Sequence, residues 1–210
     1  MIERLGYLIS SHAAYQAPLQ RLLATMRGCL ATKDVVAVIA AHPARSIHQI
    51  LVRQIHVPHN SYDYTALIDF VEHARSYPAW SHVFLLHDTM ELGPDSDRLI
   101  RNADPSLDVL AVWGGECNLC LYRVDYLLSR RDAILALKNC TKLQAVESEG
   151  FLWRQLPSER RGVYPGDIAI GDEQPIYGGA ARVPVTYTGV GITKYKANWG
   201  QLWPPSVVQP

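Results

Sequence analysis

The sequence predicts a single α/β domain with a mostly parallel central sheet flanked by helices. Short apolar runs alternate with segments of helical periodicity through residue 138, and residues 35–41 are continuously apolar and rich in β-branched side chains. Such a run is typical of a strand covered on both faces. A length of 210 residues with 48% hydrophobic content suits one domain with a sizeable core.

The first third of the chain supports this prediction element by element. Residues 6–11 form an apolar run that ends in small polar residues and predicts a strand. Residues 35–41 predict the second strand, and residues 54–58 a third that stops at a proline. Between the first two strands, an amphipathic helix is indicated by apolar residues at i, i+3, i+4 and i+7, namely Leu19, Leu22, Leu23 and Met26.

The middle of the chain continues the alternation. Asp63 is placed to cap a helix whose apolar face is Leu67, Phe70, Val71 and Ala74. Strands are then predicted at residues 83–86 and 108–113, with helices at 97–102 and 126–138.

The composition changes after Leu156, where Gly, Pro, Tyr and Trp become frequent. This change predicts an irregular C-terminal segment laid over the domain, with a candidate hairpin at residues 182–188.

Charge and targeting signals narrow the range of partners. Twenty basic and twenty acidic residues give a formal net charge of zero, so nothing global favours nucleic acid or an acidic membrane surface. The start of the chain resembles no signal peptide, and no apolar run approaches the ~20 residues of a membrane span. We therefore expect no nucleic-acid partner, no transmembrane segment and a cytoplasmic location; the oligomeric state stays open.

Cysteine spacing and common motifs exclude several chemistries. Cys117 and Cys120 form one CxxC pair without a second pair, which disfavours a metal or redox role. The sequence contains no phosphate loop, dinucleotide-binding glycine fingerprint, nucleophile elbow or His-Glu-x-x-His motif.

Polar residues gather where the predicted strands end. In open α/β sheets, ligands bind beyond the carboxyl ends of the strands, so these groups are expected to converge on one edge. They are Ser10, Ser11 and His12 after the first strand, His59 and Asn60 after the third, His87 and Asp88 after the fourth, and Gly114, Gly115 and Glu116 after the fifth.

Asp88 is the central candidate. A carboxylate at the end of a strand of four apolar residues must be solvated, paired or metal-bound. An aspartate in this position can hold a divalent cation that bridges substrate phosphates. A capping or turn aspartate is the alternative. His87 could assist a metal or a phosphate, or serve as a structural histidine.

Two further groups of charged residues are candidates. Glu147 and Glu149, near Trp153 and Arg154 at helical spacing, could supply a general base, or form a solvated helix face.

Lys194 and Lys196 alternate with Tyr195, which places both ammonium groups on one side of an extended segment. Two such point charges suit a diphosphate, and two solvated surface lysines are the alternative.

Residues 54–67 (QIHVPHNSYDYTAL), followed by residues 83–89 (VFLLHDT), resemble the nucleotide-sugar-binding half of GT-A-fold, family 2-like glycosyltransferases. The resemblance implies one GT-A-like, Rossmann-like domain over residues 1–210. Residues 1–115 would form the nucleotide-sugar-binding half, and residues 116–210 the acceptor half with the C-terminal segment.

The resemblance also implies roles for individual residues. The loop of Ser10, Ser11 and His12 would lie under the base and ribose, Asn60 and Asp63 would border the nucleotide, and Asp88 would meet a Mn²⁺ or Mg²⁺ ion or the ribose and phosphates of the donor. Glu149 resembles the acceptor-side acidic motif that acts as base. The sequence departs from the family in having one aspartate, in His87-Asp88-Thr89, where two or three acidic residues are usual.

The expected function is transfer of a sugar from a nucleotide-diphosphate donor to a hydroxyl of a glycan, lipid-linked or small-molecule acceptor. In this prediction Glu149, with Glu147 as second candidate, is the base, and Lys194 and Lys196 close over the diphosphate. A non-catalytic nucleotide- or sugar-binding module on the same fold and a nucleotidyltransferase are the alternatives.

Overall fold

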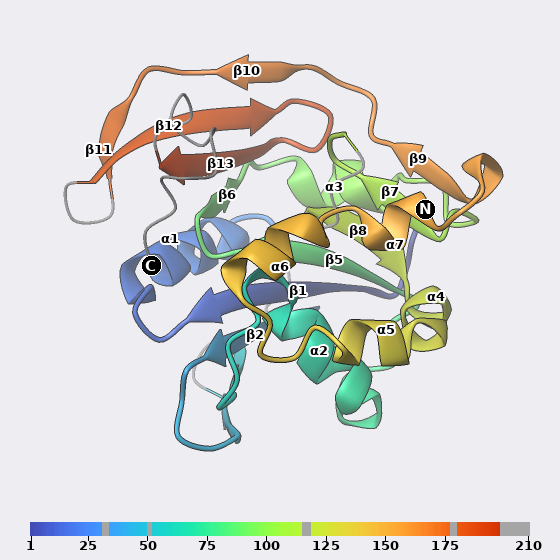
Figure 1. The fold of residues 1–210 in the computed structure, drawn as a ribbon. Helices are drawn as coiled ribbons and strands as arrows, with labels where there is room; N and C mark the ends of the chain where they lie inside the picture. The colour runs from blue at the N-terminus through green and yellow to red at the C-terminus, as the bar shows by residue number, and fades with distance from the viewer. Residues whose placement is uncertain (31–33, 50–51, 115–118, 177–179, 198–210) are drawn as a thin grey trace.

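The computed structural model describes residues 1–30, 34–49, 52–114, 119–176 and 180–197 (Figure 1). Its main sheet has eight strands in the order β3-β4-β2-β1-β5-β8-β7-β9. In chain order these strands are β1 (Leu5–His12), β2 (Val35–Ala40), β3 (Ser46–Gln49), β4 (Arg53–His56), β5 (His82–His87), β7 (Val109–Ala111), β8 (Cys120–Arg123) and β9 (Arg161–Val163).

The main sheet is mixed, which corrects the prediction of a mostly parallel sheet. Strands β4, β2, β1 and β5 run parallel to one another. Strand β8 is antiparallel to both of its neighbours, and β3 is antiparallel to β4. The reason is the length of the connections: β3–β4 and β7–β8 are joined by short segments, and only antiparallel strands can be joined so closely.

Helices cover both faces of the main sheet. One face packs against α1 (Gln16–Arg27), α3 (Ser96–Arg101) and a second sheet. The other face is covered by α2 (Thr65–Glu72), α4 (Val124–Ser129), α5 (Arg131–Leu135), α6 (Lys142–Glu147) and α7 (Phe151–Arg154). Alternate residues of β1 divide between these two cores, with Tyr7 and Ile9 on the α1 side and Leu8 on the α2 side.

Two predicted helical segments are interrupted. Residues 126–138 form α4 and α5 with a break at Arg130, in place of one helix. Glu147 and Arg154 lie on α6 and α7, which Gly150 separates by adopting a left-handed backbone with φ of 83°. The helical spacing predicted for residues 147–154 is therefore wrong.

No helix in the described ranges combines the length and the apolar character needed to cross a bilayer.

The segment after Leu156, predicted to be irregular, builds most of the second sheet (Figure 1). Its strands are β6 (Met90–Leu92), β10 (Ile168–Ile170), β11 (Gln174–Ile176), β12 (Ala180–Tyr187) and β13 (Ile192–Ala197). They pair in the order β10-β12-β13-β6, with β11 also on β12. The predicted hairpin exists but extends beyond residues 182–188, because β12 and β13 pair from Arg182 to Ala197.

Candidate functional site

The strand order reverses between β1 and β5. Strands β2 and β4 lie on one side of β1, and β5 lies on the other, although all four are parallel. In open α/β sheets, ligands bind beyond the carboxyl ends of the strands at such a reversal, and we call this place in the fold the crevice. Ser10 lies opposite His87 in the register, so the polar residues that follow both strands meet at this point.

Asp88 is held at the crevice by the end of β1. Its side chain is buried, and the Ser11 hydroxyl donates to its Oδ2 across 2.9 Å. The backbone N–H groups of His12 and Thr89 also donate to it. Burial raises the pKa of Asp88 to about 6, and the negative charge of Asp63 adds to this, while the three hydrogen bonds oppose it. Asp88 can therefore exchange a proton close to neutral pH.

Ser10 fixes the start of α2 beside the crevice. Its hydroxyl donates to the carbonyl oxygen of Asp63 across 2.9 Å and accepts from the Ala66 N–H across 3.1 Å. Asp63 was the predicted cap of this helix, but the capping position is Tyr64 and no side chain at that position makes a capping bond. A serine from another strand satisfies the free N–H instead.

Asp63 and His87 face each other beside Asp88, with 3.1 Å between His87 Nδ1 and Asp63 Oδ1, and they form an ion pair when His87 is protonated. The His87 side chain is buried, whereas Asp63 is about a third exposed.

The side chains of Asn60 and His12 accept hydrogen bonds from backbone N–H groups in their own loops. Asn60 Oδ1 accepts from the Tyr62 N–H across 3.1 Å, and His12 Nδ1 accepts from the Ala14 N–H across 3.0 Å.

The structure thus gathers five of the predicted residues into one site: Ser10, Ser11, Asp63, His87 and Asp88. Asn60 and His12 shape loops at its border. Gly115 and Glu116, which were predicted to join this edge, lie outside the described residues, as does Cys117 of the CxxC pair.

The segment bearing the predicted catalytic glutamates packs beside this site. Helix α6 contacts the short helix η2 (Tyr62–Tyr64), which carries Asp63. The Ser61 hydroxyl accepts from the Asn139 N–H across 2.9 Å, and the rings of Tyr64 and Phe151 lie 5.9 Å apart.

The two glutamates differ in their surroundings. Glu147 is exposed at the end of α6 and lines an open pocket of about 430 Å³ together with Asn139 and Gln144. Glu149 is half-buried in the turn before α7, and its carbonyl oxygen accepts from Arg154 Nη2 across 2.6 Å.

Lys194 lies on the paired strand β13 rather than on an irregular segment. It lies opposite Met90 in the register of β13 and β6, and the next residue, Tyr195, donates its N–H to the Thr89 carbonyl across 2.9 Å. Strand β13 therefore runs along the residues that follow Asp88. Lys196 belongs to the same strand, and its side chain lies outside the described part of the structure.

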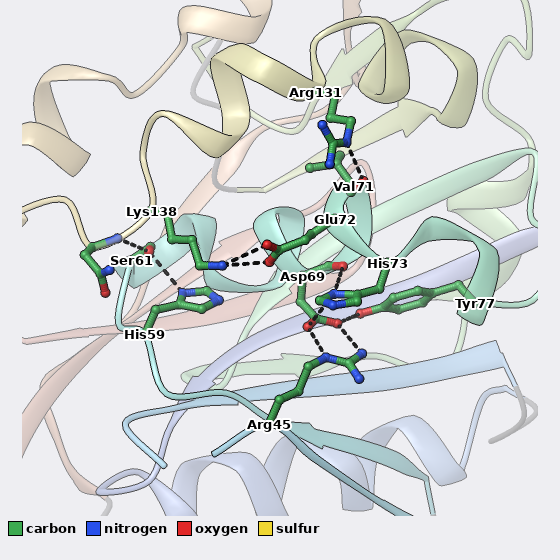
Figure 2. A network of polar contacts seen from close by, with 11 residues as sticks. Arg45, His59, Ser61, Asp69, Val71, Glu72, His73, Tyr77, Arg131 and Lys138 are labelled. Atoms are coloured by element: carbon green, nitrogen blue, oxygen red, sulfur yellow. Dashed lines mark hydrogen bonds and ion pairs between the residues drawn. The ribbon is translucent and has the colours of Figure 1, made fainter. Parts of the chain in front are cut away.

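Figure 2 shows a network that anchors α2 and that the sequence did not predict. Asp69 on α2 is buried, and it accepts from Arg45 Nε and Nη2 across 2.8 and 3.2 Å and from the Tyr77 hydroxyl across 2.8 Å. His73 Nδ1 lies 3.2 Å from the same carboxylate. The available signal was a charged residue between Leu67 and Phe70 on an apolar helix face.

The predicted Mn²⁺ or Mg²⁺ ion fits this site only as an ion that a bound diphosphate also holds. Among the described residues, no group of three or more His, Cys, Asp or Glu side chains is already arranged around a metal ion. Asp88 offers one carboxylate that already accepts three hydrogen bonds. Mg²⁺ is commonly held by one or two carboxylates together with substrate phosphates and water. A cation carried by a diphosphate and touching Asp88 therefore stays a prediction.

Comparison with known proteins identifies no family for this chain, so its function has to be inferred from these residues. No protein-family model matches the chain, and no curated protein matches it significantly.

Proposed function

We propose that this protein binds a nucleotide-diphosphate sugar in the crevice between β1 and β5 and transfers the sugar to an acceptor hydroxyl, as a GT-A-like glycosyltransferase does. The observation that carries the proposal is the meeting of Ser11 and Asp88 where the strand order reverses. The start of α2 lies beside them, because the Ser10 hydroxyl accepts from the Ala66 N–H there.

In this proposal the crevice recognises the nucleotide. Asp88 is the acceptor for donor hydroxyls, because its buried carboxylate lies in a place of low dielectric, where hydrogen bonds are strong. Asp63 borders the nucleotide with its partly exposed carboxylate. Ser10 acts as a positioning residue, since its hydroxyl already donates and accepts within the protein.

In the proposed transfer step, the two glutamates and Lys194 have the following roles. The acceptor oxygen forms a bond to the anomeric carbon while the bond from that carbon to the phosphate oxygen breaks. Glu149, or Glu147 beside the open pocket, takes the acceptor proton, and the nucleotide diphosphate leaves with the electron pair. Lys194, on the strand next to Thr89, offsets the charge of the leaving diphosphate.

Calorimetry tests the binding part of the proposal. Tag-free protein is titrated with uridine, guanosine, adenosine and thymidine diphosphate sugars, each with and without Mn²⁺ or Mg²⁺. We expect one donor to bind, and we expect Asp88→Asn to weaken it at least about tenfold through loss of a charged hydrogen-bond acceptor. Asp104→Asn is the matched control, because Asp104 is exposed and, among the described residues, its side chain bonds only to Ser106 in its own turn.

The results separate the transferase from its alternatives. Failure of every donor to bind the wild-type protein contradicts the proposal. Binding without donor turnover, in the presence of a panel of glycan and small-molecule acceptors, favours a non-catalytic module. Release of pyrophosphate from a nucleoside triphosphate favours a nucleotidyltransferase.

A further inference from the structure

Three of the eight histidines gather at the edge of the main sheet, away from Asp88. They are His42, which follows β2, His48 on β3 and His56 at the end of β4. We call them the histidine cluster. The backbone holds all three segments together, because β3 pairs with β4, β4 pairs with β2, and the His42 N–H donates to the Val57 carbonyl across 3.0 Å.

The imidazole rings of the cluster are in direct contact. His56 Nδ1 and His42 Nε2 lie 2.7 Å apart and share a hydrogen bond, and their ring centroids are 3.9 Å apart. The ring of His48 lies 4.8 Å from that of His56, and its Nε2 is 3.2 Å from the Ser46 hydroxyl. His48 is exposed, so its ring can turn without disturbing the core.

We propose that the histidine cluster binds a divalent transition-metal ion of the zinc, copper or nickel class. Neutral imidazole is a preferred ligand for these ions. Three ligands from three segments would leave one position of a tetrahedral site open to water or another ligand.

The required rearrangement is small. Bonds of about 2.0–2.1 Å from a tetrahedral ion place two ligand nitrogens roughly 3.3–3.4 Å apart. His42 Nε2 and His56 Nδ1 must therefore separate by only ~0.6 Å from their hydrogen-bonded position. The proton between them must move to the other nitrogen of its own ring, so that both rings stay neutral and both facing nitrogens have a lone pair for the ion. His48 must turn away from Ser46, and this step explains why no three such side chains of the described residues already surround one point.

The protonation state of the cluster agrees with the proposal. Burial, followed by the neighbouring His42 and His48, lowers the pKa of His56. A lowered pKa favours the neutral imidazole, which is the form that binds a metal ion. Two inter-strand spacings, ~10 Å, separate β4 from β1, so this inference does not depend on the proposed nucleotide site.

The test uses the full chain without a histidine tag. Zn²⁺ and Ni²⁺ are titrated by calorimetry in chelator-free buffer at neutral pH, and Cu²⁺ is added for electron paramagnetic resonance. We expect one ion per chain and nitrogen couplings from imidazole ligands. His48→Ala should lower the affinity at least about tenfold, since even an outer-shell partner is worth that much.

Two further variants serve as controls for the measured metal affinity. Ser46→Ala removes only the hydroxyl that holds His48, so the affinity should stay the same or rise. His73→Ala removes a histidine outside both the cluster and the proposed nucleotide site and should leave the affinity unchanged. Absence of saturable binding overturns the proposal, as does binding that survives unchanged in both His48→Ala and His56→Ala. The melting temperature of each metal-free variant verifies that it folds.

Discussion

Ser11 and Asp88 join the ends of two neighbouring parallel strands through a hydrogen bond of 2.9 Å, although they are 77 positions apart in the chain. The bond ties the last residues of β1 to the loop after β5 at the point where the strand order reverses. It also holds a buried carboxylate whose pKa is raised to about 6.

The first prediction concerns the pH dependence of Asp88. Its pKa in the folded chain is raised from 3.8 to about 6, so its contribution to stability is present at low pH and is lost as the pH rises through about 6. Asp88→Asn has no such loss. The free energy of unfolding of the variant, relative to wild type, should therefore increase between about pH 4 and pH 7. Urea denaturation at several pH values measures this, and parallel profiles contradict it.

Ser10→Ala should weaken the start of α2. The substitution leaves the Ala66 N–H without its acceptor and the Asp63 carbonyl without a donor. We expect a loss of about 1–2 kcal/mol in the free energy of unfolding. Ser129→Ala is the matched control, because within the described ranges the hydroxyl of the exposed Ser129 bonds only to the carbonyl of Tyr126 in α4. It should change the free energy of unfolding by less than about 0.5 kcal/mol. Equal losses in both variants contradict the capping role.

Asp69→Asn should be strongly destabilising. It removes one partner of a buried ion pair and should cost about 3 kcal/mol, the low end for such pairs because Arg45 is partly exposed. Asp95→Asn, in an exposed pair with Arg98, should cost less than about 1 kcal/mol in the same chemical denaturation experiment.

The same carboxylate should contribute to acid sensitivity. Burial raises the pKa of Asp69, but the hydrogen bonds from Arg45 and Tyr77 outweigh it, and the pKa lies below its ordinary value. Its contribution to stability is therefore present above about pH 4 and is lost as the pH falls. Wild type should lose stability on acidification more steeply than Asp69→Asn. Identical acid-unfolding curves argue against this assignment.

The proposed transfer reaction predicts different effects for the two glutamates. If Glu149 is the base, Glu149→Gln should lower donor turnover by about 10²–10⁴-fold and leave donor affinity unchanged. Glu147→Gln should have a much smaller effect. Steady-state kinetics with the donor identified by calorimetry measures both, and the reverse order of effects transfers the role of base to Glu147, which lines the open pocket.

The positions of the inner strands could be predicted because each is an uninterrupted apolar run. Residues 35–41 and 83–86 correspond closely to β2 and β5. The direction of a strand is not encoded in such a run, since it depends on how the chain returns to the sheet. For this reason the apolar residues 120–122 did not reveal that β8 would be antiparallel to β5 and make the sheet mixed.

The candidate site was predictable as a set of strand ends, but not as a set of contacts. Ser10 and Asp88 follow apolar runs, which is a local signal. The bonds from Ser10 to Ala66 and from Asp63 to His87 join residues that only the folded chain brings together. Local pattern therefore indicated which residues end the strands, whereas the Ser10 cap, the contact of Asp63 with His87 and the anchor at Asp69 required the tertiary structure.

The pairing of β6 with β13 has a consequence for folding during synthesis. Leu92 lies opposite Ile192, so β6 leaves the ribosome about a hundred residues before its partner. At roughly 5–20 residues per second, that interval lasts about 5–20 seconds. During this time the edge of β6 and the apolar side chains of Met90 and Leu92 lack their final cover. A nascent chain of this protein should therefore be most prone to aggregation, and most dependent on chaperones, just before β13 emerges.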